Sequence, residues 1–61
     1  MTDKFTDEEH LFRHIDGGLI TASFEYSVRG HKMKAESLMD ARQALHKLLP
    51  DIHKSVRAKG G

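Results

Sequence analysis

The sequence contains no cysteine, a single proline and no long apolar run. Without cysteine the chain has no disulfide framework, no thiolate ligand for zinc and no catalytic thiol. Its apolar stretches fall far short of the ~20 residues that cross a bilayer, and the opening Met-Thr-Asp-Lys-Phe does not resemble a signal peptide. These absences predict a cytoplasmic protein without a membrane partner.

The chain has only 61 residues, enough for one small domain. We expect that domain to span residues 1–61, with frayed ends at 1–4 and 58–61. A chain of this size buries only ~60% of the surface that its unfolded form exposes, so its stability is marginal. Self-association would bury more apolar surface, and we therefore expect a homodimer.

The net charge is only +1, but the charges are unevenly distributed. Residues 1–25 carry six acidic and two basic side chains, a net charge of −4. Residues 26–61 carry eight basic and three acidic side chains, a net charge of +5. This dipolar layout favours head-to-tail attraction between copies, or contact between the basic half and an acidic partner.

Residues 19–28 alternate between apolar and polar side chains. The apolar positions are Ile20, Ala22, Phe24, Tyr26 and Val28. Alternation with a period of two is typical of a half-buried antiparallel strand. Arg29-Gly30 then predicts a turn, and residues 31–35 alternate again, so the two segments are expected to form a β-hairpin.

The C-terminal half predicts an amphipathic helix over residues 38–49. Ser37 suits its N-cap position. The apolar stripe recurs at spacings of three and four residues and comprises Leu38, Ala41, Leu45 and Leu48. Pro50 lacks an N–H group and should end the helix, beyond which Ile52 and Val56 lie four residues apart and predict a short second helix.

Residues 7–16 are compatible with two structures. A helix is favoured by Thr6 as N-cap with Glu9 three residues later, and by Gly17 as a C-terminal cap. A strand is favoured by Asp16-Gly17, a strong hairpin signal, although either register would turn a charge or an imidazole toward the core. In both cases the expected fold is α+β, a small antiparallel β-hairpin or three-stranded meander packed against the C-terminal amphipathic helix.

A local resemblance supports this fold. The stretch DGGLITASF (16–24) followed by AESLMDARQAL (35–45) resembles the hairpin-then-helix of HicB-type antitoxins, and their join is similar to that in small phage proteins that bind and inhibit host enzymes. In place of the proline- and glycine-containing segment of the antitoxin pattern, the chain has EYSVRGHKM (25–33). The resemblance implies a fold and no particular activity.

Two histidines suggest metal chemistry. His10 and His14 lie four residues apart, the spacing at which two imidazoles on a helix chelate a divalent ion. The zincin motif requires glutamate directly after the first histidine, and Leu11 occupies that position. Because no third ligand is evident, we expect no metal site and no cofactor, and keep a histidine-based metal-binding module as a remote alternative.

We expect no enzymatic activity. No spacing marks a nucleophile with its base and orienting group, and no glycine-rich loop is placed to cradle phosphate. A domain this small also has little material for a water-excluding pocket.

Positive charge is the remaining functional signal. It predicts a regulatory or inhibitory binding protein whose basic hairpin and helix face contacts an acidic protein partner. The expected contact residues are Arg29, His31, Lys32, Lys34, Arg42 and Lys47. The alternative is a nucleic-acid-binding protein that contacts phosphates with the same residues, although the pI of about 8.2 is below the ~9 expected of such a domain.

Overall fold

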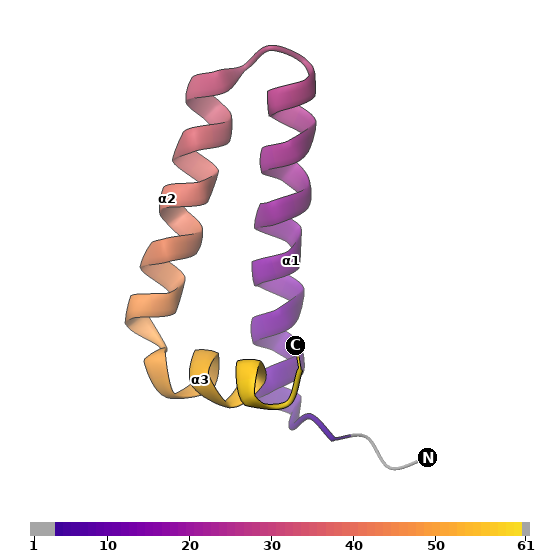
Figure 1. Cartoon of the computed structure of the whole chain (residues 1–61), viewed down its shortest axis with the longest axis vertical. Helices are drawn as coiled ribbons and strands as arrows, with labels where there is room; N and C mark the ends of the chain where they lie inside the picture. Colours follow the sequence, from indigo (N-terminus) through magenta and orange to yellow (C-terminus); the bar gives the residue numbers. More distant parts are fainter. Residues whose placement is uncertain (1–3, 61) are drawn as a thin grey trace.

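The computed structural model describes residues 4–60, and this part of the chain forms three helices and no strand. Helix α1 spans Asp7–Val28, α2 spans Lys32–Leu48 and α3 spans Pro50–Ala58. The first two run antiparallel as a helical hairpin, and α3 turns across the open end of the hairpin beside the beginning of α1 (Figure 1). The predicted α+β fold is therefore wrong.

Helix α1 begins with a capping box. The Thr6 hydroxyl accepts a hydrogen bond from the Glu9 amide at 3.1 Å, and the Glu9 carboxylate accepts one from the Thr6 amide at 2.8 Å. These bonds satisfy two donors that the helix start would otherwise leave free. The helical alternative for residues 7–16 is thus confirmed, but the helix continues through Gly17 to Val28.

The face of α1 that packs on α2 and α3 explains why the strand prediction was wrong. Its members recur at alternating spacings of four and three residues and are Glu9, Phe12, Asp16, Leu19, Ser23 and Tyr26. Every second member is polar, so the apolar residues alone do not show the helical period. Phe24, which the alternation placed in the core, is 67% exposed.

Both stretches that resemble HicB-type antitoxins are helical. Residues 16–24 lie within α1 and residues 35–45 within α2. They pack side by side near the hairpin turn, where the buried Ser23 hydroxyl donates a hydrogen bond to the Ala35 carbonyl at 3.1 Å. The hairpin-then-helix that the resemblance implied is therefore absent from the described chain.

Helix α2 begins six residues earlier than the sequence predicted, at Lys32. The turn at Arg29-Gly30 was placed correctly, but it joins two helices, and Gly30 adopts a φ of 85°. Ser37, the predicted N-cap, lies inside α2, where its hydroxyl donates to the Met33 carbonyl at 2.9 Å. The second predicted strand is thus the first turn of a helix.

The end of α2 confirms the role predicted for Pro50. Helix α2 ends at Leu48, and Pro50 is the first residue of α3. A proline is well accommodated there, because the first amide of a helix has no intrahelical partner. Helix α3 is the predicted short second helix, with Val56 buried and Ile52 half-buried.

The apolar core of residues 4–60 is small, with one buried apolar side chain from each helix: Phe12, Ala35 and Val56. Phe12 lies at the open end of the hairpin. The centroid of its ring is 5.8 Å from that of His46 on α2 and 6.0 Å from that of His53 on α3. Phe12 is therefore the apolar residue that brings the three helices together.

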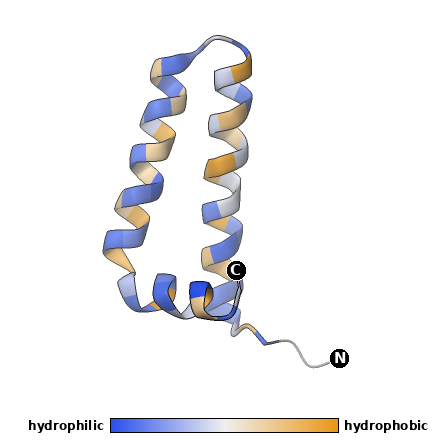
Figure 2. Cartoon of the chain, viewed as in Figure 1, coloured by the Kyte–Doolittle hydropathy of each residue, from blue (hydrophilic) through white to orange (hydrophobic). Residues whose placement is uncertain are grey.

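Polar residues predominate over much of the remaining surface. Figure 2 shows hydrophilic residues along α2 and α3, interrupted by single apolar ones. None of the three helices combines the length and the apolar character needed to cross a membrane. Of the predicted frayed ends, residues 1–3 and 61 lie outside the described residues, and whether the others fray stays a prediction.

Two glycine substitutions should change stability in opposite directions. A Cβ atom added at Gly17, inside α1, would meet nothing within 4 Å. Gly17→Ala should therefore raise the free energy of unfolding by about 0.5–1 kcal/mol, because alanine loses less backbone entropy in a helix. Gly30→Ala should lower it by about 1–2 kcal/mol, since the left-handed backbone disfavours a Cβ atom. Urea unfolding followed by circular dichroism measures both, and a destabilised Gly17→Ala would contradict the expectation.

Candidate functional site

Four of the six predicted contact residues lie together at the closed end of the hairpin. Arg29 is the C-cap of α1, His31 is the N-cap of α2, and Lys32 and Lys34 lie in the first turn of α2. All four side chains are exposed. We refer to these residues as the basic tip.

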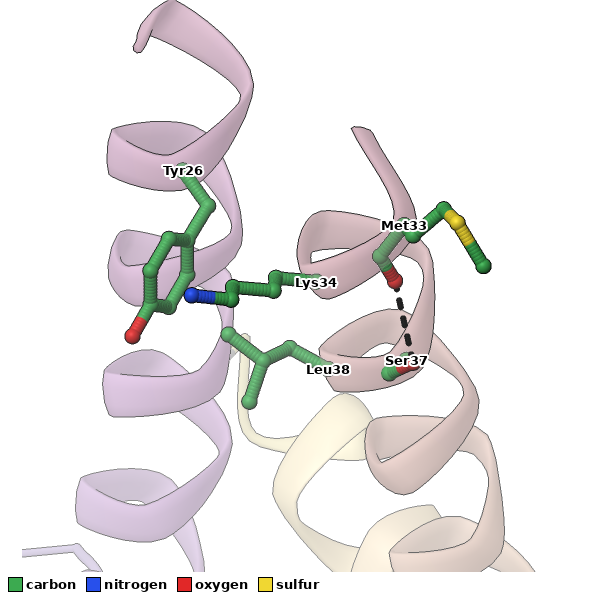
Figure 3. A pocket seen from close by; sticks show the side chains of 5 residues that line it. All are labelled: Tyr26, Met33, Lys34, Ser37 and Leu38. Carbon is green, nitrogen blue, oxygen red and sulfur yellow. Dashed lines mark hydrogen bonds between the residues drawn. The ribbon is translucent and has the colours of Figure 1, made fainter. Parts of the chain in front are cut away.

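An aromatic ring on α1 supports the basic tip. The Lys34 ammonium lies 5.5 Å from the centroid of the Tyr26 ring, and the His31 ring meets the same ring edge-on at 6.0 Å. Figure 3 shows the Lys34 side chain reaching from α2 toward Tyr26 on α1. Arg29 pairs loosely with Glu25 at 3.7 Å, on a surface where solvent weakens the attraction.

The charges of the basic tip oppose the dipole of α2. The first turn of α2 contains no acidic residue, and its N-cap His31 makes no side-chain hydrogen bond to the helix. By contrast, α1 carries three acidic residues in its first turn and α3 carries Asp51. Each lysine at the positive end of a helix costs about 0.3–1 kcal/mol at low salt. Lys32 and Lys34 therefore weaken the helix on which they lie.

The other two predicted contact residues are elsewhere. The Arg42 Nε atom donates to the Asp16 carboxylate at 2.9 Å, and this side chain is half-buried between α1 and α2. Lys47 is exposed in the last turn of α2, at the opposite end of the hairpin from the basic tip. The six residues therefore do not form one continuous surface.

A polar cluster that the sequence did not reveal joins the three helices at the open end. Asp16 on α1 accepts from Arg42 and lies 2.7 Å from Nε2 of His46 on α2. The His46 ring stacks on His53 of α3, with the two centroids 3.8 Å apart and the planes 13° from parallel. Together with Phe12, these side chains contribute to a cleft of about 330 Å³.

The cluster shifts the pKa values of two of its members. Partial burial alone would raise the pKa of Asp16, but hydrogen bonds from His46 and Arg42 outweigh it and lower the pKa below 3.8. Loss of hydration lowers the pKa of His53 below 6.5, and the charges of His46 and Arg57 lower it further. The cluster thus favours the ionised form of Asp16 and the neutral form of His53.

A second polar cluster joins the beginning of α1 to the end of α3. The Glu9 carboxylate is buried and accepts hydrogen bonds from the Lys59 ammonium at 2.6 Å and from the Ser55 hydroxyl. The Lys59 hydrogen bond is the largest cause of a Glu9 pKa lowered from 4.5 to about 2, followed by the bonds from Ser55 and Thr6. Sequence reasoning found only the Thr6 capping bond, because the other two partners are 46 and 50 residues away.

These clusters hold the fold together. Among residues 4–60, no serine, threonine or tyrosine hydroxyl lines the cleft beside His46 and His53. The Ser55 hydroxyl is already engaged by Glu9. The arrangement supplies attractive contacts between helices whose apolar core is too small to fix them alone.

His10 and His14 both lie on α1 at the helical spacing that chelation needs, and both are exposed. The His10 ring packs edge-on against Phe5, with the two centroids 5.6 Å apart. Across residues 4–60, no three histidine, aspartate or glutamate side chains are grouped so as to hold a metal ion. The two candidates therefore have no third ligand in the part of the chain that the structure describes.

Comparisons with models of protein families, with curated proteins and with solved structures found no match to this chain.

Proposed function

We propose that the chain is a small, non-enzymatic binding protein that acts in the cytoplasm and contacts an acidic protein partner through the basic tip. Its role would be regulatory or inhibitory, exerted by occupying the surface of that partner.

The charge at the start of α2 carries this proposal. Lys32 and Lys34 occupy positions where acidic residues would stabilise the helix, as they do in α1 and α3. A partner carboxylate placed there would neutralise the lysines and accept from the free amides of the first helical turn. The lysine charges, which are unfavourable in the free protein, would then form favourable pairs with the partner.

The surface beside the basic tip adds apolar contact area. Tyr26, Met33 and Leu38 line a shallow groove of about 330 Å³ next to Lys34 (Figure 3). Aromatic and methionine side chains are common in protein contacts, where charge steers the encounter and apolar burial supplies affinity.

The test is a charge reversal at the tip. Lys32→Glu should weaken partner binding by roughly tenfold or more, because a like charge replaces an attractive one. It should also stabilise α2 by a few tenths to 1 kcal/mol, since an acidic side chain suits the helix start. A loss of binding therefore could not be attributed to unfolding. Lys47→Glu, an exposed reversal at the far end of the same helix, is the matched control.

The measurement is crosslinking of wild type and both variants in a lysate of the source organism, followed by identification of the captured protein and titration with it. The expected result is an acidic protein bound equally by wild type and Lys47→Glu and more weakly by Lys32→Glu. Equal binding by all three would overturn the proposal. Capture that a nuclease abolishes would overturn it in favour of nucleic acid as the partner.

A further inference from the structure

Helix α3 leaves one side of the hairpin uncovered. The cleft that α3 helps to line, with His53 and Arg57, opens on the side of α1 and α2 that carries Asp16 and His46. The groove beside Tyr26 opens on the other side of the hairpin. Figure 3 views this side from behind Figure 1, so that α1 lies on the left and α2 on the right. Within residues 4–60, no third helix covers this second side.

This uncovered side is apolar along most of its length. The helical positions that share it run from Leu11 through Ile15 to Ala22 on α1, and from Leu48 through Ala41 to Leu38 on α2. Leu11, Ile15 and Leu48 are exposed, Leu48 by as much as 76%. The positions between them at steps of three and four residues are Gly18 on α1 and Leu45 on α2, and both are uncharged. We call these six residues the free apolar face.

Charge at the two ends of the face sets the orientation of a second copy. Lys34 lies at the end near the turn, whereas Glu8 and Asp51 flank Leu48 at the open end. A twofold axis that crosses the hairpin places the Lys34 end of each copy against the Glu8 and Asp51 end of the other. The parallel arrangement would instead bring like charges together, which is unfavourable.

The groove at the turn end provides a matching shape. It is lined by apolar parts of Tyr26, Met33 and Leu38 and is open to solvent. In the antiparallel arrangement it lies opposite Leu48 of the second copy, an exposed leucine of the same face. An exposed leucine facing an apolar groove is the kind of complementarity on which helix packing depends.

We propose that the free apolar face binds a second copy of this chain in antiparallel orientation, to form a dimer of hairpins in which four long helices share one core. Each Leu48 occupies the groove of the other copy, and each Lys34 faces Glu8 and Asp51. Lys32 lies about 200° around α2 from Lys34 and stays outside this interface, so the Lys32 test of the proposed function and the tests below can fail separately. Lys34 and the groove are used in both proposals, so an acidic partner and a second copy would compete for them.

A matched pair of isoleucines tests which face is used. Ile15 and Ile20 lie on the same helix and are both 43% exposed, but they occupy opposite sides of the hairpin. Ile15→Glu should raise the dissociation constant of the dimer by roughly 100-fold or more, because two carboxylates would enter an apolar interface. Ile20→Glu should leave it nearly unchanged. Sedimentation equilibrium measures both, with circular dichroism as the check on helix content.

Disulfide crosslinking gives a second test that tolerates partial loss of stability. The chain has no cysteine, so one introduced thiol can react only with its counterpart in another copy. Gly18 lies toward the free apolar face and Gly17 away from it, and added Cβ atoms at both positions meet nothing within 4 Å. Under mild oxidation Gly18→Cys should form a disulfide-linked dimer, and Gly17→Cys should remain mostly unlinked.

Charge reversal tests the orientation. Lys34→Glu should weaken the dimer, and adding Glu8→Lys and Asp51→Lys to it should restore the affinity, because the complementary ends are then exchanged.

A wild type that sediments as a monomer at high concentration would overturn the inference. So would a dimer lost in Ile20→Glu but kept in Ile15→Glu, or crosslinking through Gly17→Cys alone. Failure of the triple variant to recover would overturn the antiparallel arrangement.

Discussion

Phe12→Ala is expected to abolish the folded state. Phe12 is only 3% exposed and contacts the rings of His46 and His53, so its removal opens a cavity where the three helices meet. Truncating a buried phenylalanine costs about 3–5 kcal/mol. A core in a domain of this size supplies roughly the same amount in total. The variant should therefore show little helical circular dichroism and no cooperative thermal transition.

Phe24→Ala is the matched control, since it makes the same chemical change on the same helix. Phe24 is 67% exposed, and its truncation should change the free energy of unfolding by about 0.5 kcal/mol or less. Both variants should be compared with wild type at one protein concentration, because self-association stabilises the folded state by mass action. Greater damage from Phe24→Ala than from Phe12→Ala would mean that the alternating pattern describes the core better than the helical one.

Local signals in the sequence predicted the boundaries of several elements correctly. The capping box at Thr6 and Glu9, the turn at Gly30, and Pro50 between two helices are each set by residues within one or two turns of one another. Their physical causes are amide satisfaction, access to positive φ and the missing N–H group of proline. Such causes act at short range, so a single sequence shows them.

The helical structure of α1 beyond residue 16 could not be predicted from such local signals. Its packing face uses Glu9, Asp16 and Ser23 where an ordinary amphipathic helix would have apolar residues. Each is acceptable only because a distant partner meets it, such as Arg42 for Asp16 and Ala35 for Ser23. These partners are chosen by the tertiary fold, and no local pattern identifies them. The visible alternation from residue 20 onward was therefore mistaken for a strand.

The part of the candidate site that was predicted correctly consists of residues that are close together in the sequence. Four of the predicted contact residues are close in sequence, between Arg29 and Lys34, so they remain neighbours in a β-hairpin or a helical hairpin alike. Arg42 was assigned to the same surface because of its positive charge and its place on the predicted helix. In the helical fold Asp16 engages it instead. Positive charge alone could not distinguish a free arginine from a paired one.

Acid should destabilise the fold through the buried carboxylate of Glu9. Its pKa in the folded state is about 2, against an ordinary value of 4.5, and the hydrogen bond from Lys59 is the main cause. Between about pH 4.5 and pH 2 the unfolded chain therefore binds a proton that the folded chain does not. This contribution to stability is complete above pH 4.5 and is lost as the pH falls toward 2. Asp16, with a pKa below 3.8, acts in the same direction.

Glu9→Gln isolates the contribution of this carboxylate. Glutamine has nearly the same shape but cannot form an ion pair with Lys59 and does not titrate. At neutral pH the variant should be less stable than wild type, and the difference should shrink steadily as the pH falls from 4.5 to 2. His53, with a pKa below 6.5, also weakens the fold as the pH falls, but it does so in both proteins and cancels in the difference. Urea unfolding at a series of pH values measures the two curves, and parallel curves across this range would show that Lys59 does not hold Glu9 in its ionised form.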